Sequence, residues 1–295
     1  MTPRFGRVST AMITPFSADG SLDLDGAVAL AKWLIEQGND SLVLAGTTGE
    51  SATLSHDEQI ELIAAVASEI DAPIIAGAGS NNTRAAVELT KRASNAGAAG
   101  ILTVTPYYNR PSQAGLLAHF SEVAKATDLP VILYDIPGRT GTKIETTTLL
   151  RLADSLPNIV GLKDAAGDPA ETARFIAAAP DHFEVYSGDD KLTLSLLAVG
   201  AVGCIGVATH WVAGQTAEMM QAFFDKLDPA LAAEINQRLL PSWQWESSPE
   251  APNPVPTKAM LKVLGQPGGD CRLPMGPEPE GLAAEAKQIL AGLAK

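Results

Sequence analysis

The sequence contains few cysteines and few basic residues, and these shortages exclude several classes of protein. Only two of its 295 residues are cysteine, Cys204 and Cys271. They could form at most one disulfide, and no cysteine or histidine spacing matches a zinc site. Lysine and arginine total 21 against 34 aspartate and glutamate residues, a formal net charge of -13. Phosphate binding needs clustered basic residues, so we expect two free thiols, no metal site and no nucleic-acid partner.

Long hydrophobic runs are also missing. No stretch approaches the ~20 apolar residues of a membrane helix, and the opening "MTPRFGRVST" lacks the apolar core of a signal peptide. We therefore expect no membrane association and a cytoplasmic location. Hydrophobic residues make up 46% of the chain and charged residues 19%, which is ordinary composition for a globular protein with a sizeable core.

Eight short apolar and β-branched runs alternate with segments whose apolar residues have helical spacing. Strands that alternate with helices predict a parallel sheet buried on both faces. Eight such units predict an α/β fold, a closed (β/α)8 TIM barrel. The eight runs are residues 8–13, 41–46, 73–79, 100–105, 130–136, 159–165, 183–188 and 204–209.

The alternation stops near residue 225, and a different organisation follows. A proline-rich segment, "SSPEAPNPVPTK", separates helices expected at about 229–245, 256–264 and 280–293. We therefore predict a catalytic barrel over residues 1–224 and a C-terminal helical extension over 225–295.

The sixth predicted strand ends in a lysine, Lys163, which is unusual because lysine is almost never fully buried. Ile159, Gly161 and Lys163 have the same parity. If they face the barrel interior, Gly161 leaves space beneath the lysine side chain, and the lysine amine extends to the open end of the barrel. Desolvation would lower the pKa of that amine and give the neutral nucleophile that a Schiff base needs. The alternatives are that the Lys163 amine reaches solvent at the strand end, or that it pairs with the Asp164 carboxylate.

Two further features lie at neighbouring strand ends. Tyr134 can face inward on the fifth strand beside Lys163, where its phenol could relay protons, although an inward tyrosine is more often a core residue. The turn "GTTGE" places Thr47 and Thr48 between glycines, where hydroxyls and backbone N–H groups can hold a carboxylate. Its glycines could equally serve only turn geometry.

Six segments in order resemble those of the dihydrodipicolinate synthases, within the pyruvate-dependent aldolase superfamily that includes N-acetylneuraminate lyase. The resemblance spans nearly the whole chain. It implies that pyruvate and L-aspartate 4-semialdehyde condense to 4-hydroxy-tetrahydrodipicolinate, in lysine and diaminopimelate biosynthesis, without a metal or organic cofactor. The segments are "GTTGESATLSHDE", "TVTPYYNRPSQAG", "YDIPGRTG", "GLKDAAGD", "SGDD" and "EAPNPVPTK".

The resemblance implies four catalytic residues. Lys163 corresponds to the lysine that forms an imine with pyruvate, and Tyr134 to the phenol that relays protons. Thr47 corresponds to the hydroxyl that links this phenol to a second tyrosine. That tyrosine is Tyr108, which in the family enters from the neighbouring subunit, so we expect a homotetramer built as a dimer of dimers.

Four substrate-binding residues follow from the same resemblance. Thr48 corresponds to the residue that holds the pyruvate carboxylate, and Ile205 offers a backbone carbonyl near the nucleophile. Arg139 corresponds to the arginine that binds the carboxylate of aspartate semialdehyde. Gly188 is the fourth predicted substrate-binding residue.

Lysine-inhibited members of the family bind lysine at the subunit interface, and this sequence matches their pattern only in part. Gln59 stands where a histidine is expected, and Ala85 stands where a glutamate is expected. We expect weak or absent inhibition unless Glu88, one helical turn away, supplies the missing charge. The corresponding residues are Ser51, Ala52, His56, Gln59, Asn81, Ala85 and Tyr107.

Two other functions remain open at this point. One is another pyruvate-dependent aldolase, such as an N-acetylneuraminate or keto-deoxy sugar acid lyase; Arg139 argues against it, because a guanidinium pairs with a carboxylate in two parallel bonds. The other, of a different class, is a non-catalytic barrel that binds a keto acid. One residue departs from the family pattern: Asp135 stands where many members have asparagine.

Overall fold

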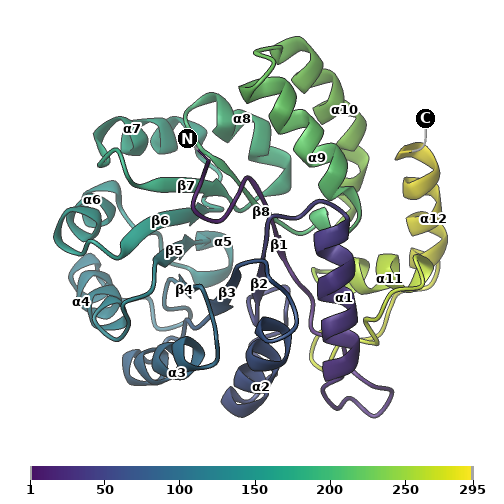
Figure 1. The fold of residues 1–295 in the computed structure, drawn as a ribbon, viewed down its shortest axis with the longest axis horizontal. Helices are drawn as coiled ribbons and strands as arrows, with labels where there is room; N and C mark the ends of the chain where they lie inside the picture. The colour runs from purple at the N-terminus through teal and green to yellow at the C-terminus, as the bar shows by residue number, and fades with distance from the viewer. Residues whose placement is uncertain (1, 294–295) are drawn as a thin grey trace.

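The computed structural model describes residues 2–293, and eight parallel strands in it form one closed barrel (Figure 1). Each strand pairs with the next along the chain, and the last pairs with the first. The predicted (β/α)8 fold is therefore confirmed. The strands are β1 (Val8–Ala11), β2 (Ser41–Leu44), β3 (Ile74–Gly77), β4 (Gly100–Val104), β5 (Val131–Asp135), β6 (Ile159–Asp164), β7 (Glu184–Ser187) and β8 (Gly203–Gly206).

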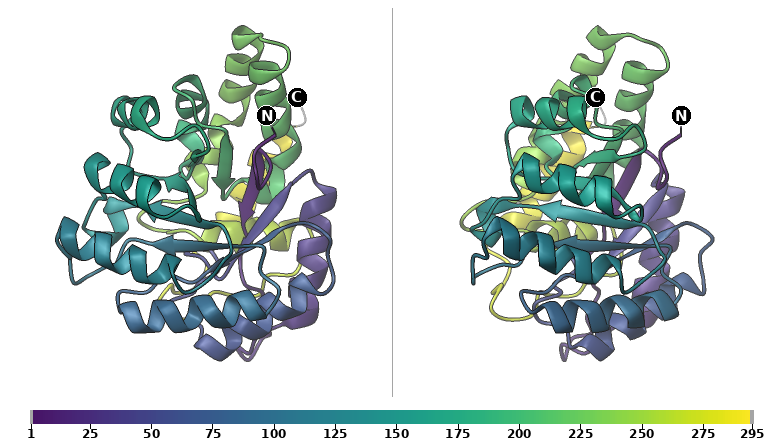
Figure 2. Two further views of the ribbon diagram at one scale, coloured as in Figure 1. Left: turned by 60° about the vertical axis from the view of Figure 1, so that its left-hand side comes forward. Right: turned by 90° about the vertical axis from the view of Figure 1, so that its left-hand side faces the viewer.

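Helices surround the strands (Figure 1, Figure 2). Ser55 and Glu58 form a capping box at the start of α2. Ser112 caps α4, and Asn82 caps α3. The helices are α1 (Leu24–Glu36), α2 (His56–Ala67), α3 (Thr83–Asn95), α4 (Gln113–Ala124), α5 (Pro137–Thr140), α6 (Thr146–Ser155), α7 (Pro169–Ala178), α8 (Thr193–Ala198) and α9 (Thr209–Phe224), with a 3-10 turn, η1 (Asp190–Leu192).

Neighbouring residues of one strand belong to two different apolar clusters. In β5, Ile132 and Tyr134 join the cluster inside the barrel, whereas Val131 and Leu133 join the layer beneath the helices. Both faces of the strand are therefore buried, as the near-continuous apolar runs of the sequence indicate. Cys204 and Cys271 are both free. No helix within residues 2–293 is long and apolar enough to cross a membrane.

We expected Ile159, Gly161 and Lys163 to lie on one face of β6, and this prediction is wrong for Ile159. Ile159 belongs to the layer beneath the helices and not to the face of Lys163. The register of β5 and β6 shifts, so that Val131 pairs with Ile159 while Ile132 pairs with Gly161. One residue of β6 is left over at this point, which is the geometry of a β-bulge.

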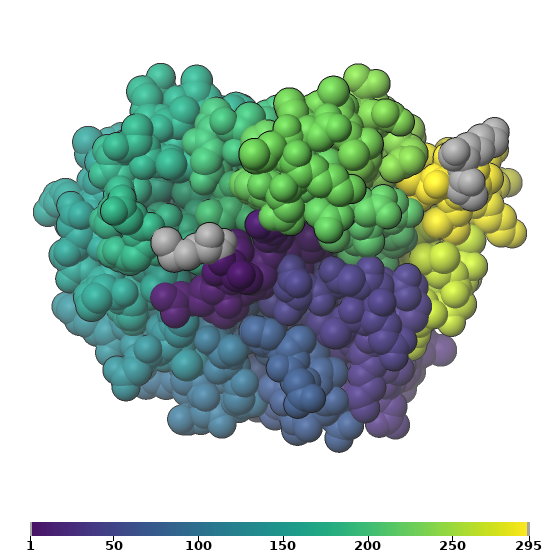
Figure 3. All heavy atoms as spheres, turned by 45° about the horizontal axis from the view of Figure 1, so that its top comes forward, coloured from purple at the N-terminus to yellow at the C-terminus, as the bar shows by residue number. Residues whose placement is uncertain are grey.

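A helical tail follows the barrel, with bounds close to those predicted: α10 (Pro229–Trp245), α11 (Val255–Val263) and α12 (Leu282–Leu293). It lies on one flank of the molecule, where Figure 3 shows the yellow C-terminal residues next to the green residues of the preceding helices. Trp243 of α10 is fully buried and joins the same apolar cluster as Val8 and Met219 of the barrel. The division into two units at residue 225 stays a prediction.

Two tail residues hold the loop that follows β2. The Asn253 amide donates a hydrogen bond to Thr48 Oγ1 over 3.0 Å. Lys258 Nζ lies 2.7 Å from Glu50 Oε1, and the two side chains are only 3% and 1% exposed. Glu50 has a φ of 55°, which is uncommon for a residue other than glycine. The buried ion pair therefore helps to hold an unfavourable backbone conformation next to Thr48.

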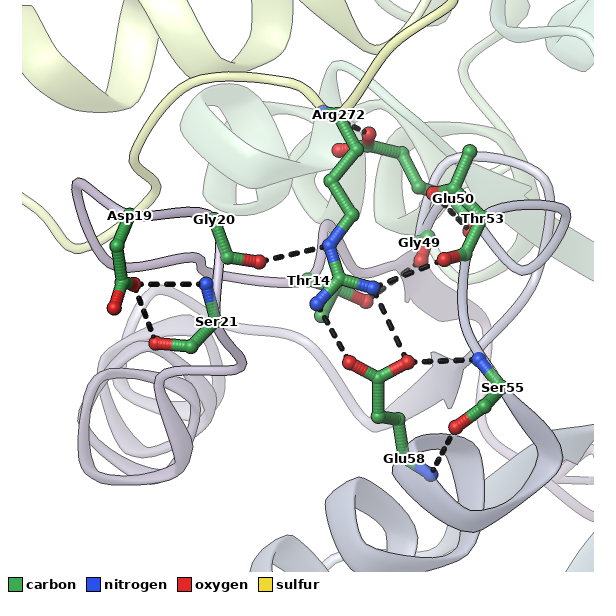
Figure 4. A network of polar contacts seen from close by, with 10 residues as sticks. All are labelled: Thr14, Asp19, Gly20, Ser21, Gly49, Glu50, Thr53, Ser55, Glu58 and Arg272. Atoms are coloured by element: carbon green, nitrogen blue, oxygen red, sulfur yellow. Dashed lines mark hydrogen bonds and ion pairs between the residues drawn. The ribbon is translucent and has the colours of Figure 1, made fainter.

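Arg272 makes a third contact with the same loop (Figure 4). Its guanidinium donates to Glu58 at 2.6 and 3.1 Å and to the carbonyl oxygen of Thr53 at 2.9 Å. Its backbone N–H donates to Glu50 Oε2 at 2.9 Å. The hydrogen bonds from Arg272 lower the pKa of the Glu58 carboxyl to about 2. The tail thus fixes the loop after β2 at Thr48, at Glu50 and at the start of α2.

We expect Lys258→Met to lower the free energy of unfolding by about 3–5 kcal/mol, because it leaves the Glu50 carboxylate buried without its counter-charge. Methionine keeps the apolar stem of the lysine, so the change removes mainly the ammonium group. Urea denaturation measures the loss, at one fixed protein concentration because the stability of an oligomer depends on concentration.

Lys262→Met is the matched control on the same helix, since the Lys262 side chain is 72% exposed. We expect it to change stability by less than about 0.5 kcal/mol. Equal losses in the two variants would show that the buried pair contributes nothing specific to stability.

Candidate active site

Lys163 lies at the carboxyl end of β6 and is only 4% exposed. Desolvation lowers the pKa of its amine from 10.5 to about 8, so a substantial neutral fraction exists near neutral pH. The amine does not pair with Asp164, one of the alternatives left open above. Asp164 instead accepts hydrogen bonds from Thr172 Oγ1 and the Ala166 N–H on the outer side of the barrel. A buried lysine amine with a lowered pKa can act as a nucleophile.

Tyr134 on β5 lies beside Lys163, and the two residues pair directly in the sheet register. The Lys163 Nζ is 4.5 Å from the centre of the tyrosine ring. Burial raises the pKa of the phenol from 10 to about 12, and a hydrogen bond with the Thr47 side chain partly opposes this. The phenol is therefore protonated near neutral pH and can donate a proton. The structure brings together three of the four predicted catalytic residues.

Gly188 packs against the stem of Lys163. A Cβ atom at position 188 would lie 2.9 Å from Lys163 Cγ and 3.0 Å from Cε, closer than real side-chain contacts allow. The room for the lysine therefore comes from Gly188 in the loop after β7. It does not come from Gly161 as we expected, because a Cβ atom there would lie 2.6 Å from the backbone oxygen of Glu184.

The other predicted binding residues lie at the ends of neighbouring strands. Thr48 is buried in the turn after β2 and is oriented by Asn253. Ile205 is buried in β8 and belongs to the apolar cluster inside the barrel, together with Tyr134. Asn253 is a residue that the sequence analysis missed, although the "NP" segment was quoted as part of the resemblance. Its contact joins positions 205 residues apart, and no local pattern predicts such a pair.

Arg139 is exposed at the rim of a cavity of about 450 Å³. Thr47 contributes to the wall of the same cavity. The segment "PGRTG" forms the short helix α5 and ends at Gly141, which has a φ of 74°. This left-handed residue favours glycine and turns the chain back directly after Arg139. Arg139 thus supplies a cationic side chain to the cavity that Thr47 also lines.

Tyr108 is placed differently from the other predicted catalytic residues. Its side chain is 90% exposed, and its φ of 72° is rare for a tyrosine. It lines a separate hollow together with Arg110 and Gly141, and it is not part of the cavity wall that includes Thr47. Within this one chain, Tyr108 does not reach the site of Lys163.

The residues of the predicted effector site are only partly brought together. Five of them line the 450 Å³ cavity: Ser51, Ala52, His56, Gln59 and Tyr107. Asn81 and Ala85 are not part of that wall, and Glu88 is exposed on α3. Gln59 is buried and donates to the Ser51 carbonyl at 3.0 Å.

Asp135, the departure from the family pattern, lies on the outer side of the barrel next to Asp164 in register. Burial raises the pKa of its carboxyl to about 7, while a hydrogen bond from the Ile144 N–H opposes the rise. Asp135 does not line the cavity that contains Thr47 and Arg139.

Together these features define a class of protein. A parallel barrel that holds a desolvated lysine against a protonated phenol at its mouth has the arrangement of an imine-forming lyase. The chain belongs to the dihydrodipicolinate synthetase family, whose family model matches residues 4–292.

Individual relatives agree with this assignment. A 4-hydroxy-tetrahydrodipicolinate synthase of Acidothermus cellulolyticus is 52% identical over 274 residues, which cover 92% of this chain and 87% of the relative. The crystal structure of the Cyanidioschyzon merolae enzyme with lysine bound has a TM-score of 0.96 at 41% identity, with 99% of each chain covered. A monomeric dihydrodipicolinate synthase variant has a TM-score of 0.92 at 35% identity, covering 98% of this chain and 96% of its own.

We expect Gly188→Ala to slow imine formation with pyruvate by roughly tenfold to a hundredfold, because the new methyl group would displace the Lys163 stem and misplace the amine. The measurement is the initial rate of borohydride-trapped pyruvate adduct, followed by mass spectrometry. Gly138→Ala is the control, since a Cβ atom there meets nothing within 4 Å. An unchanged trapping rate in Gly188→Ala would contradict the packing role given to this glycine.

Proposed function

We propose that this chain condenses pyruvate with L-aspartate 4-semialdehyde through an imine on Lys163 and releases 4-hydroxy-tetrahydrodipicolinate. The observation that carries the proposal is the buried Lys163 amine in contact with the Tyr134 ring. The family and the names of its relatives support the same reaction. Such a reaction belongs to lysine and diaminopimelate biosynthesis, and we propose the cytoplasm as its location.

The first half of the reaction builds a carbon nucleophile. The neutral Lys163 amine attacks the ketone carbon of pyruvate, and the carbinolamine loses water to give a protonated imine. Tyr134 donates and accepts the protons of this step, and Thr47 orients its hydroxyl. The cationic imine then withdraws electrons from the methyl group, which loses a proton and becomes an enamine. Thr48 holds the pyruvate carboxylate during these steps.

The second half forms the ring. The enamine carbon attacks the aldehyde carbon of the second substrate, whose carboxylate Arg139 binds at the cavity entrance. The amino group of that substrate then attacks the imine carbon and displaces the Lys163 amine. One water and one proton leave over the whole reaction. The backbone carbonyl of Ile205 accepts a hydrogen bond near the nucleophile.

The alternatives predict different outcomes. A sugar-acid lyase needs groups that recognise hydroxyls at the cavity entrance, where this chain has the Arg139 guanidinium. A barrel that only binds a keto acid does not require a desolvated amine beside a protonated phenol. A turnover assay with pyruvate and aspartate semialdehyde separates both alternatives from the proposal.

We expect borohydride reduction in the presence of pyruvate to attach the substrate covalently to Lys163 and to abolish activity, because the reduced imine cannot be hydrolysed. Peptide mass spectrometry identifies the modified residue. Lys163→Arg should remove the adduct, whereas Lys191→Arg, a change of an exposed lysine, should leave it. An adduct on another lysine, or no adduct, would refute the mechanism.

We also propose a homotetramer in which Tyr108 completes the site of a neighbouring subunit. The exposure of Tyr108 and its rare backbone conformation support this role. The fold alone does not determine the assembly, since a similar structure is a monomeric variant.

Mixing two inactive variants tests the shared site. Lys163→Ala and Tyr108→Phe subunits should regain partial activity after exchange, because some sites then receive an intact lysine and an intact tyrosine. Mixed tetramers are verified by native mass spectrometry. No recovery in verified mixed tetramers would place Tyr108 in the site of its own subunit.

Regulation by lysine is proposed to be weak or absent. A relative of known structure binds lysine, but here Ala85 offers no carboxylate to a cationic effector. Loss of a charge-assisted contact costs about 1.5–3 kcal/mol, or roughly tenfold to a hundredfold in affinity. Steady-state rates at increasing lysine concentration measure the effect. Strong inhibition below a millimolar would show that another group replaces the missing charge.

A further inference from the structure

A segment of the tail forms part of the wall of the cavity that Arg139 lines. Pro274 and Met275, which lie between α11 and α12, line this cavity together with Thr47 and Arg139. Pro274 is exposed, whereas Met275 is half-buried and packs on an apolar cluster of the tail. Since Arg139 is the proposed site for the carboxylate of the second substrate, the tail contributes to the surface that this substrate meets.

The two wall residues lie in a stretch of chain, residues 266–279, that forms neither helix nor strand. Their position therefore depends on contacts with other parts of the protein. The Met275 N–H donates a hydrogen bond to the carbonyl oxygen of Arg272 at 3.1 Å, which closes a tight turn over residues 272–275. The place of this turn in the cavity wall is consequently set by whatever holds Arg272.

The guanidinium of Arg272 is held on two sides (Figure 4). Besides its hydrogen bonds to Glu58 and Thr53, its Nε donates to the carbonyl oxygen of Gly20 at 2.9 Å. Its central carbon lies 4.2 Å from the centre of the Phe16 ring, and the side chain is only 20% exposed. Arg272 thus joins the loop after β1 to the start of α2 and fixes the turn against both.

We propose that Arg272 is a positioning residue for the second substrate, because its pairing with Glu58 holds residues 272–275 as part of the cavity wall. The proposal rests on the condensation of pyruvate with aspartate semialdehyde given above. Without the guanidinium the turn would lose its anchor, and the cavity that Arg139 lines would lose a fixed wall. Lys163 is not part of that wall, so the reaction with pyruvate should proceed at its normal rate.

A purely structural role of Arg272 predicts a different result. Its backbone N–H also donates to Glu50, and its guanidinium to the carbonyl oxygen of Thr53, both in the loop that carries Thr48. If the arginine acted only by supporting that loop, its loss would also impair binding of the pyruvate carboxylate and slow adduct formation. A difference between the two substrates therefore separates positioning of the wall from support of the loop.

Steady-state kinetics of Arg272→Met are the first test. We expect the KM for aspartate semialdehyde to rise roughly fivefold to tenfold with kcat little changed, which is the pattern of lost substrate binding. The initial rate of borohydride-trapped pyruvate adduct should change by less than about twofold. Arg272→Lys keeps the charge but not the bidentate pair with Glu58, so its KM should lie between the two. Arg151→Met, a change of an exposed arginine on α6, is the control.

Glu58→Gln tests the partner of the arginine. Glutamine retains the capping box of α2 and removes the charge that pairs with Arg272. This variant should raise the KM for aspartate semialdehyde as well. The double variant with Arg272→Met should be no worse than Arg272→Met alone, because both changes remove one interaction. Additive effects would show that the two residues act independently and would overturn the proposed pairing.

Cys271 reports on the same segment without any substrate. It directly precedes Arg272, is partly buried and carries a free thiol, whereas the other free thiol, Cys204, is only 1% exposed. Alkylation of Cys271 should be roughly fivefold faster in Arg272→Met, because the segment opens locally, while Cys204 stays unreacted. Peptide mass spectrometry measures both rates, and melting curves verify that the variants are folded. Glu58→Gln and Arg272→Lys provide the same measurement if Arg272→Met does not fold.

The outcomes distinguish this inference from the proposed function. Absence of turnover in the unaltered protein would refute the condensation, and with it the role toward the second substrate. Normal turnover with an unchanged KM in Arg272→Met would refute the positioning role alone. A pyruvate adduct slowed as much as the KM rises would also overturn it, since Arg272 would then act through the loop of Thr48. Unchanged alkylation of Cys271 would show that the arginine does not hold the segment.

Discussion

The burial of one amine is the constraint on which the site depends. Water would stabilise the ammonium form of Lys163, so the protein must exclude it to keep a neutral fraction near neutral pH. The barrel achieves this with strands buried on both faces, and Gly188 leaves room for the stem alone. Desolvation also keeps the neighbouring Tyr134 protonated. A single physical cause therefore prepares both a nucleophile and a proton donor.

The tail serves the same site from outside the barrel. Asn253 orients Thr48, and the buried pair of Lys258 and Glu50 fixes the turn in which Thr48 lies. Each contact joins the tail to a loop at the carboxyl ends of the strands, where barrel enzymes carry their chemistry. Removing the tail would expose polar groups that the site needs buried, so barrel and tail depend on each other for function.

Local patterns predicted the strands and the helices of the tail, because each depends on residues close in sequence. The bulge in β6 was missed since Val131 and Ile159 must be compared across two strands. Asn253 was missed for the same reason, because its contact with Thr48 joins residues distant in sequence. The room that Gly188 leaves for Lys163 comes from the absence of a side chain, which no local pattern reveals. The role of Tyr108 came from the resemblance and stays a prediction, because it depends on a neighbouring subunit and the structure describes one chain.

A cationic intermediate in a desolvated site raises a problem that burial alone cannot solve. The environment that favours the neutral amine also disfavours the protonated imine, because both charged forms lose the same hydration. A fixed anion near the nitrogen offsets this cost without admitting water. Desolvation lowers the pKa of the Lys163 amine and the charge of Asp190 partly opposes this, so the amine can be neutral first and cationic later.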